Sequence, residues 1–329
     1  MKARLHFQRV RDLAASPLIQ VRDRFLFRDH RSWTRPSRWP IRPPTQPPNG
    51  NPFFIIGSPR SGTTLLRAIL AQHPALFIPP ENGALGVMIR TFAAHRSHPW
   101  EAVIASVLEV FRQGYEFHHW NVDVAAIQRA AEAVPQGERS LVGLLDLIYH
   151  QYGTRHFPGK TRWGDKTVPG NVVYLGKIDL VFPQARYIHI VRDGRDCVAS
   201  AVNVGMFHKD FLYAAYGWKD TVRRCRRLAP RLRAQGRFLE VRYEDLIVSP
   251  ESVVSGLCRF LGLQPTDAML RYSGRTEHLP DVRVIAHHQK VGRPISRDSI
   301  GNWRHLIPEP VLPSVLRILR KELAAWGYE

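Results

Sequence analysis

Residues 57–64 combine the residue types that hold phosphate groups in proteins. They read Gly-Ser-Pro-Arg-Ser-Gly-Thr-Thr, follow the apolar run 53–56, and precede apolar residues at helical spacing in 65–70. A strand, a glycine-containing turn and a helix in this order wrap backbone amides around a phosphate. The candidate phosphate ligands of this loop are Arg60, Ser61, Gly62, Thr63 and Thr64.

The loop lacks the lysine that nucleoside triphosphatases need. Gly57 and Gly62 have the spacing of the GxxxxGK[ST] motif, but the residue after Gly62 is Thr63. Because that lysine clamps the β- and γ-phosphates, its absence argues against a kinase or an NTPase, which is kept as the alternative function. Arg60 places a positive charge inside the turn instead, which suits a phosphate-bearing donor handled without a metal ion.

A second anion-binding element follows the predicted strand at residues 187–191, which is mostly apolar. Arg192 comes directly after this strand, and Ser200 lies eight residues further on, in the predicted next helix. A guanidinium at the carboxyl end of a strand and a hydroxyl two turns into the following helix can converge on one phosphate. The alternative for Arg192 and Asp193 is a surface ion pair of little energetic value.

These two elements resemble the donor-binding motifs of the sulfotransferases that use 3′-phosphoadenosine 5′-phosphosulfate (PAPS), nearest the bacterial and tyrosylprotein branches. The resemblance implies that residues 58–65 bind the 5′-phosphosulfate and that Arg192 and Ser200 hold the 3′-phosphate. It covers most of residues 51–310 and leaves the first fifty uncovered. The expected function is therefore transfer of a sulfuryl group from PAPS to a hydroxyl group, with an amine as the second choice of acceptor.

Three further segments carry the resemblance. Residues 164–167, Gly-Asp-Lys-Thr, are similar to the GDKTP element of the family, although Val168 stands before the proline. The stretch Arg-Tyr-Glu-Asp-Leu around Tyr243 matches a motif whose tyrosine lies beside the adenine of the donor. The late run 291–304 resembles the loop that folds over the donor, which implies a donor contact from its last residue, Arg304.

Sulfuryl transfer needs fixed cations and a base. Negative charge grows on the oxygen that bridges sulfur and phosphorus, and the acceptor hydroxyl must lose a proton. Arg60 and Lys166 are the predicted cations, with a surface position as the alternative for Lys166, and no metal ion is expected because no metal-binding motif occurs. The resemblance implies that Glu81, after the second predicted strand, is the base. The alternatives are a helix-capping Glu81 and His73 as the base.

The elements that must position these residues alternate between strands and helices. The apolar run 53–56 and the mostly apolar segments 75–78, 187–191 and 238–241 predict strands, with helices between them. Such alternation is typical of a parallel sheet with right-handed crossovers. We therefore expect an α/β, P-loop-like three-layer fold with a central parallel sheet of about five strands flanked by helices.

The chain is expected to divide near residue 50. Residues 1–50 are basic and proline-rich, and they predict an N-terminal extension and linker, with a strap packed on the main domain as the alternative interpretation. Residues 51–329 are the predicted sulfotransferase domain, with a helical insertion at about 84–151. That insertion and the loop 273–300 are expected to shape the acceptor pocket.

The net charge of the chain favours anionic partners but does not select one class of them. The chain has 47 Lys and Arg against 28 Asp and Glu, a net charge of +19, which attracts anions. PAPS accounts for part of this excess. A nucleic-acid-binding module is a further alternative, but no nucleic-acid-binding motif occurs. The basic first fifty residues also offer a surface for peripheral contact with an anionic membrane.

The cysteine content bears on the location of the protein, and several classes of acceptor stay open. Three cysteines without a CxxC spacing fit a reducing compartment, so the sequence predicts a cytoplasmic location. The acceptor is a hydroxyl-bearing carbohydrate, peptide, lipid or small metabolite. Neither that choice nor the oligomeric state can be read from the residues.

Overall fold

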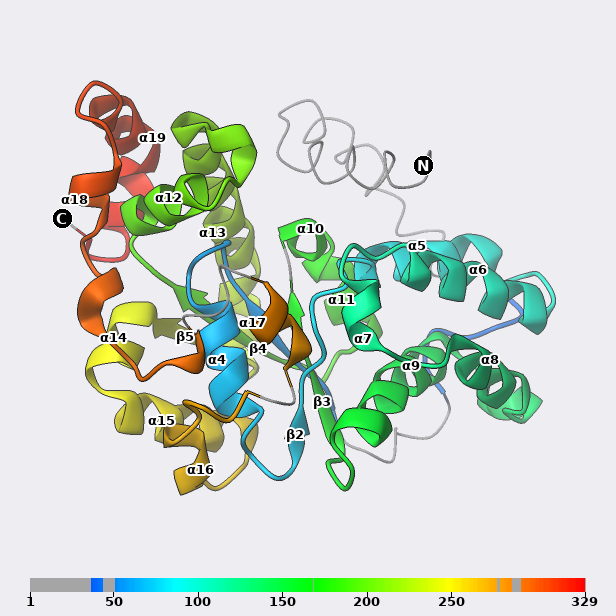
Figure 1. The fold of residues 1–329 in the computed structure, drawn as a ribbon. Coiled ribbons are helices and arrows are strands. Elements are labelled where there is room, and N and C mark those ends of the chain that lie inside the picture. Colours follow the sequence, from blue (N-terminus) through cyan, green and yellow to red (C-terminus); the bar gives the residue numbers. More distant parts are fainter. Residues whose placement is uncertain (1–36, 44–50, 168, 277–278, 286–290, 329) are drawn as a thin grey trace.

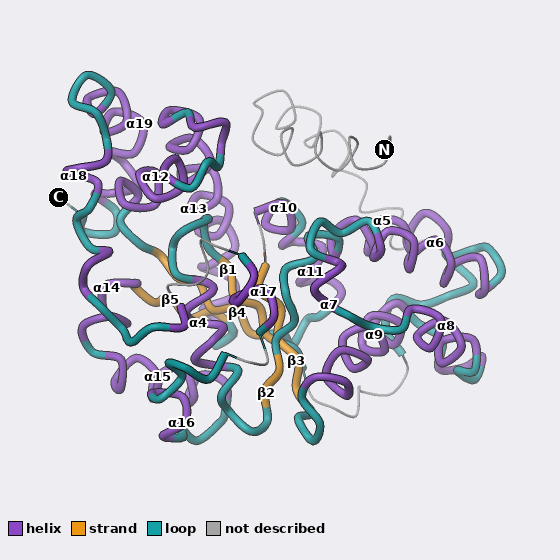
Figure 2. Tube along the Cα trace, viewed as in Figure 1, coloured by secondary structure: helices purple, strands orange, loops and turns teal. Residues whose placement is uncertain are grey.

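A five-stranded sheet lies at the centre of the structure (Figure 2). The structure is a computed structural model. It describes residues 37–43, 51–167, 169–276, 279–285 and 291–328. The strand order is β2-β3-β1-β4-β5, and every neighbouring pair is parallel. The strands are β1 (Phe53–Ile56), β2 (Leu76–Phe77), β3 (Arg162–Thr167), β4 (Arg186–Val191) and β5 (Phe238–Arg242).

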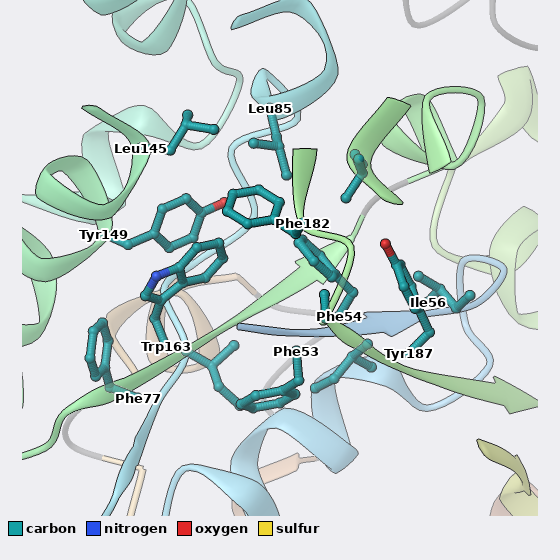
Figure 3. Packing of buried hydrophobic residues seen from close by; sticks show 14 of the residues in the cluster. Phe53, Phe54, Ile56, Phe77, Leu85, Leu145, Tyr149, Trp163, Phe182 and Tyr187 are labelled. Carbon is teal, nitrogen blue, oxygen red and sulfur yellow. The ribbon is translucent and has the colours of Figure 1, made fainter. Parts of the chain in front are cut away.

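The central strand β1 forms because its residues are apolar on both faces. All four are buried, as expected for a strand covered by helices on both sides of a parallel sheet. The ring of Phe54 stacks on Tyr187 of β4 at 5.3 Å and meets Trp163 of β3 edge-on at 6.0 Å (Figure 3). These aromatic contacts bind the three middle strands together across the sheet.

Helices flank the sheet on both sides, so the predicted α/β three-layer fold is confirmed (Figure 1). Helix α4 follows β1 directly and packs against it, and α13 and α15 pack against β5. The helices outside the 84–156 region are α4 (Thr63–Leu70), α10 (Pro169–Val172), α11 (Leu175–Val181), α12 (Gly194–Asn203), α13 (Phe211–Ala234), α14 (Tyr243–Val248), α15 (Pro250–Leu261), α16 (Asp267–Leu270), α17 (Pro280–Val284), α18 (Trp303–Leu306) and α19 (Leu312–Ala324).

The segment between β2 and β3 is helical. It lies beside the β2–β3 side of the sheet, and its last long helix packs against β3 (Figure 1). Short 3₁₀ turns occur here and later in the chain, at Gln136–Glu138, Phe207–Lys209 and Arg297–Ser299. The helices of this segment are α5 (Leu85–His95), α6 (Trp100–Arg112), α7 (Phe117–Trp120), α8 (Val124–Glu132) and α9 (Leu141–His156).

Strand β3 has no strand-like pattern in the sequence. It reads Arg-Trp-Gly-Asp-Lys-Thr, which has neither an apolar run nor regular alternation, yet it pairs with β1 and β2. Its buried carboxylate, Asp165, accepts hydrogen bonds from Tyr149 Oη (2.6 Å) and Thr167 Oγ1 (2.7 Å). Polar residues are tolerated inside the sheet because their hydrogen bonds are satisfied there.

Residues 37–43 pack on the helices beyond β3. The indole of Trp39 is buried and donates to the carbonyl oxygen of His98 at 2.8 Å, and the carbonyl oxygen of Pro40 accepts from Leu141 N at 3.2 Å. These seven residues therefore pack on the main domain, and the strap interpretation for the whole of residues 1–50 stays a prediction. The rest of the predicted extension, 1–36 and 44–50, lies outside the described residues. No helix in the described part of the chain is long and apolar enough to cross a membrane.

Candidate active site

Each of the five strands delivers a predicted site residue at its carboxyl end. The phosphate loop follows β1, Glu81 follows β2, Lys166 lies near the end of β3, Arg192 follows β4 and Tyr243 follows β5. The carboxyl ends of parallel strands meet at one edge of a sheet, and ligands bind in the crevice there. The topology therefore gathers residues that are far apart in the sequence.

The phosphate loop is closed by its own polar groups. The backbone N–H and the hydroxyl of Ser61 both donate to the carbonyl oxygen of Ser58, at 3.2 Å and 2.7 Å. Ser61 is fully buried, so its side chain holds the loop shape. Arg60 adopts a left-handed backbone with φ 67°, an unusual conformation for a residue other than glycine. The first turn of α4 follows, with backbone N–H groups that have no partner within the helix.

Gly62 is required where the loop meets α14. Its φ is +100°, and a Cβ atom there would lie 2.5 Å from Cδ2 of Tyr243. The ring of Tyr243 therefore packs directly on the loop backbone. The guanidinium of Arg192 lies over the same ring, 4.6 Å from its centroid. The two segments that the resemblance assigns to the donor, around Gly62 and around Tyr243, thus touch each other.

The two predicted anion-binding elements form one cluster. Arg60 Nε donates to Ser200 Oγ at 3.0 Å, and Arg192 Nη1 donates to the carbonyl oxygen of Arg60 at 3.0 Å. Burial, and then the neighbouring charge of Arg192, lower the pKa of Arg60. Two cations held close together in a buried place favour an anionic ligand between them. In this structure Arg60 reaches toward Ser200, the end assigned to the 3′-phosphate.

A second cluster connects the phosphate loop to Glu81. Lys166 Nζ lies 2.6 Å from Glu81 Oε1 and donates to Thr64 Oγ1 at 3.1 Å. The other carboxylate oxygen of Glu81 accepts from the hydroxyl of Tyr115. Lys166 is 1% exposed at its side chain and Glu81 is 18% exposed, so the surface alternative for Lys166 is wrong. A carboxylate and an ammonium thus stand next to a hydroxyl of the phosphate loop.

The alternatives for the base have structural roles. Helix α5 begins after Ala84, whose backbone N–H donates to Asn82 Oδ1 at 3.2 Å, so Asn82 and not Glu81 forms the turn before the helix. Nδ1 of His73 accepts from Ala75 N at 3.1 Å, and its Nε2 lies 3.1 Å from the carbonyl oxygen of Gln264. Both ring nitrogens of His73 therefore bind backbone. Among the described residues, no three His, Cys, Asp or Glu side chains gather as metal ligands would.

Asp196 is a site residue that the sequence reasoning left out. Its two carboxylate oxygens accept from the backbone N–H groups of Gly301 (2.8 Å) and Trp303 (2.9 Å). The same late loop receives a hydrogen bond from Arg192 at the carbonyl oxygen of Ser299. Asp196 lies one helical turn after Arg192, and that spacing was the available signal. It holds the late loop against the cluster of cations.

Arg304, predicted to contact the donor, packs on the ring of Trp303 in the structure. Arg304 lies in α18, with its guanidinium over the ring of Trp303 at 4.6 Å. Arg195 lies over the same ring at 4.5 Å. The part of the late loop that touches Arg192 is the backbone of Ser299. The donor contact of Arg304 stays a prediction.

Glu116 was also missed, because a lone glutamate in a helical segment carries no motif. It is 6% exposed, and its Oε2 has no hydrogen-bond partner among the described residues. Burial, and then the charge of Glu81, raise the pKa of Glu116 to about 8. The fully buried ion pair of Arg67 and Asp281 (2.6 Å) adds further charges to the same surroundings. A neutral Glu116 avoids a further negative charge in this cluster.

Comparison with known proteins agrees with this geometry. Residues 52–267 match the model of the Sulfotransferase family. The chain is 27% identical over 285 residues to protein-tyrosine sulfotransferase 1 of Danio rerio, covering 84% of this chain and 72% of that one, and 25% identical over 287 residues to protein-tyrosine sulfotransferase 2 of Gallus gallus, covering 84% and 69%.

A solved structure supports the fold. The sulfotransferase domain from the Synechococcus PCC 7002 olefin synthase aligns with a TM-score of 0.58 at 24% identity, covering 87% of this chain and 98% of that one. The strand order, the loop after β1 and the family match over residues 52–267 lead to one conclusion. This chain belongs to the sulfotransferase family.

Proposed function

We propose that this sulfotransferase takes its sulfuryl group from PAPS and transfers it to a hydroxyl group. The observation that carries the proposal is the contact between the two anion-binding elements, from Arg192 to Arg60 and from Arg60 to Ser200. PAPS carries phosphate groups at the 3′ and 5′ positions of one ribose, so it fits two adjacent anion sites better than a donor with a phosphate at one position. Tyr243 contacts Gly62 of one element and Arg192 of the other, and the resemblance implies that the adenine lies beside this tyrosine.

The proposed chemistry uses the cluster around Lys166. Glu81 accepts the proton of the acceptor hydroxyl, whose oxygen forms the new bond to sulfur. The bond between sulfur and the bridging phosphate oxygen breaks, and Lys166 stabilises the negative charge on that oxygen, together with Arg60 once its guanidinium turns from Ser200 toward the 5′-phosphosulfate. Thr64, which already receives a hydrogen bond from Lys166, directs the lysine toward the phosphate loop. Ser61, Gly62, Thr63 and the first turn of α4 supply the remaining contacts to the 5′-phosphosulfate.

Among hydroxyl acceptors we propose the phenol of a tyrosine as the first class to test. Two matched relatives are named protein-tyrosine sulfotransferases. A phenol of this chain, that of Tyr115, already contacts Glu81, so the surroundings of the proposed base accommodate an aromatic ring. Carbohydrate, lipid and small-metabolite hydroxyls, and an amine, form the other arms of the same test.

The test is a screen of acceptors with PAPS labelled in the sulfuryl group. Transfer of label to a tyrosine peptide, with release of 3′-phosphoadenosine 5′-phosphate (PAP), is the expected result. Label on a sugar or lipid alone would keep the donor and correct the acceptor. A thermal-shift comparison checks the kinase alternative: PAP should stabilise the protein and ATP with Mg²⁺ should not, because Thr63 stands where the phosphate-clamping lysine is needed.

A further inference from the structure

Tyr115 places a phenolic hydroxyl of the chain itself on the proposed base. It lies in the turn between α6 and α7, and its hydroxyl donates to one carboxylate oxygen of Glu81. The other oxygen of Glu81 binds Lys166, which donates in turn to Thr64 of the phosphate loop. A continuous chain of contacts therefore runs from the Tyr115 hydroxyl to the place proposed for the phosphosulfate.

The backbone holds Tyr115 in this position. Its N–H donates to the carbonyl oxygen of Asn82, the residue after Glu81, at 3.2 Å. The side chain of Asn82 donates to the carbonyl oxygen of Phe111 at 3.1 Å. Gly114 makes the close approach possible, because a Cβ atom there would lie 2.2 Å from the amide atoms of Asn82. The turn that carries Tyr115 is thus fixed to the segment that carries the base.

We infer that Tyr115 is a sulfuryl acceptor of its own active site, so that the enzyme modifies itself at this residue when PAPS is bound and no other acceptor is present. The inference rests on the proposed donor and base. In the reaction the phenolic oxygen forms a bond to sulfur while the bond from sulfur to the phosphate oxygen breaks. The phenolic proton goes to Glu81, and PAP leaves.

The surroundings of Tyr115 suit both the reaction and the release of its product. Lys166 beside Glu81 provides a positive charge for the anionic sulfate ester. Once Glu81 has passed its proton to solvent, the two negative charges repel each other, and the tyrosine sulfate is driven from the base. The side chain of Tyr115 is 44% exposed, so it can move toward solvent.

The chain offers an internal control among its ten tyrosines, all of which are described. Eight are buried or half-buried, and only Tyr115 and Tyr216 are exposed. Tyr216 lies in α13 and is 56% exposed, more than Tyr115. Modification governed by exposure alone would favour Tyr216. Modification governed by the site would select Tyr115.

The experiment incubates the full chain with labelled PAPS and no added acceptor, and follows it by intact-mass and peptide mass spectrometry. We expect one SO₃ unit per chain, located on Tyr115, at a first-order rate that does not depend on protein concentration. Tyr115→Phe and Glu81→Gln should abolish the modification, and Tyr216→Phe should leave it unchanged. Calorimetry with PAP on the same samples shows that Tyr115→Phe is folded and binds the donor product.

Each other outcome overturns the inference, in a distinguishable way. If the protein binds PAP and sulfates an added acceptor but Tyr115 carries no label, self-modification is wrong and the proposed function stands. The same holds if the label lies on Tyr216 or persists in Tyr115→Phe. If the protein binds no PAP, the proposed function fails together with this inference.

Discussion

At the scale of single residues, two carboxylates near Lys166 have opposite surroundings. Both carboxylate oxygens of Glu81 have a partner, the ammonium of Lys166 on one and the hydroxyl of Tyr115 on the other. Glu116 is buried, with one oxygen that lacks a hydrogen-bond partner among the described residues, so its neutral form is favoured. This difference leaves Glu81 as the proposed base and gives Glu116 the place of a buried, protonated carboxyl group.

Replacing Glu81 by Gln should stop turnover without weakening donor binding. The amide cannot accept the acceptor's proton, so we expect a fall in kcat of about 10²–10⁴-fold. PAP affinity by calorimetry should stay within the error of the wild type, because the predicted phosphate ligands lie on other segments. Glu109→Gln, an exposed carboxylate change in α6, is the matched control. Full activity of the Glu81 variant would remove this residue as the base.

The raised pKa of Glu116 predicts that the stability of the protein depends on pH. Its pKa in the folded protein, about 8, lies above its ordinary value of 4.5, so between these pH values the folded state binds more protons than the unfolded state. The free energy of unfolding should therefore fall as pH rises through this window, by up to about 1.4 kcal/mol per pH unit. Urea unfolding of the wild type and of Glu116→Gln at several pH values checks this. An equal slope in both proteins would contradict the assignment.

At the scale of elements, the sequence predicted the segments that have a regular pattern. Strand β1 and the strand before Arg192 could be predicted because they are apolar or mostly apolar segments, each followed by a predicted anion-binding element. Strand β3 was recognised only as a family motif, because buried Asp165 and Lys166 replace the apolar residues that mark a strand. Side-chain bonds made across the fold, such as the one between Tyr149 and Asp165, leave no local signal.

The residues of the candidate site also fall into two groups, those that local spacing predicts and those that only the folded structure reveals. Arg60, Lys166 and Arg192 lie in motifs that local spacing reveals, and the structure brings each into contact with another predicted residue. Asp196 and Tyr115 act through partners about 105 and 34 positions away. Only the packing of the late loop on α12, and of the α6–α7 turn on the segment after β2, creates those contacts. Sequence spacing alone could not predict them.

The contact between the phosphate loop and α14 gives a prediction at this scale. Gly62→Ala adds a Cβ atom against Tyr243 and strains a left-handed residue, so PAP affinity should fall about tenfold or more. Gly159→Ala is the matched control, because Gly159 also has a positive φ, +85°, but no atom lies within 4 Å of the added Cβ. Gly159→Ala should lose about 1–2 kcal/mol of stability for its backbone conformation, and Gly62→Ala should lose more because its Cβ also meets Tyr243. Only Gly62→Ala should lose PAP affinity in calorimetry. Equal PAP affinities would show that the loop tolerates the change.

At the scale of the whole molecule, the fold brings five strand ends and a late loop to one place. The sheet order puts β1 between β3 and β4, so the phosphate loop lies between Lys166 and Arg192. This arrangement explains how one donor can be held at its sulfuryl end and at its 3′ end. A part of the net charge of +19 is placed here, while other arginines, such as Arg271 beside Asp267, form ordinary surface pairs.

The most direct test of this account compares PAP with adenosine 5′-phosphate by calorimetry. The wild type should bind PAP at least about tenfold more tightly, because a hydrogen bond to a charged group contributes about 1.5–3 kcal/mol. Arg192→Met should remove that preference, and Arg259→Met, at an exposed arginine of α15, should retain it. Equal affinity for the two nucleotides in the wild type, or a preference that survives Arg192→Met, would contradict the proposal that Arg192 holds the 3′-phosphate of the donor.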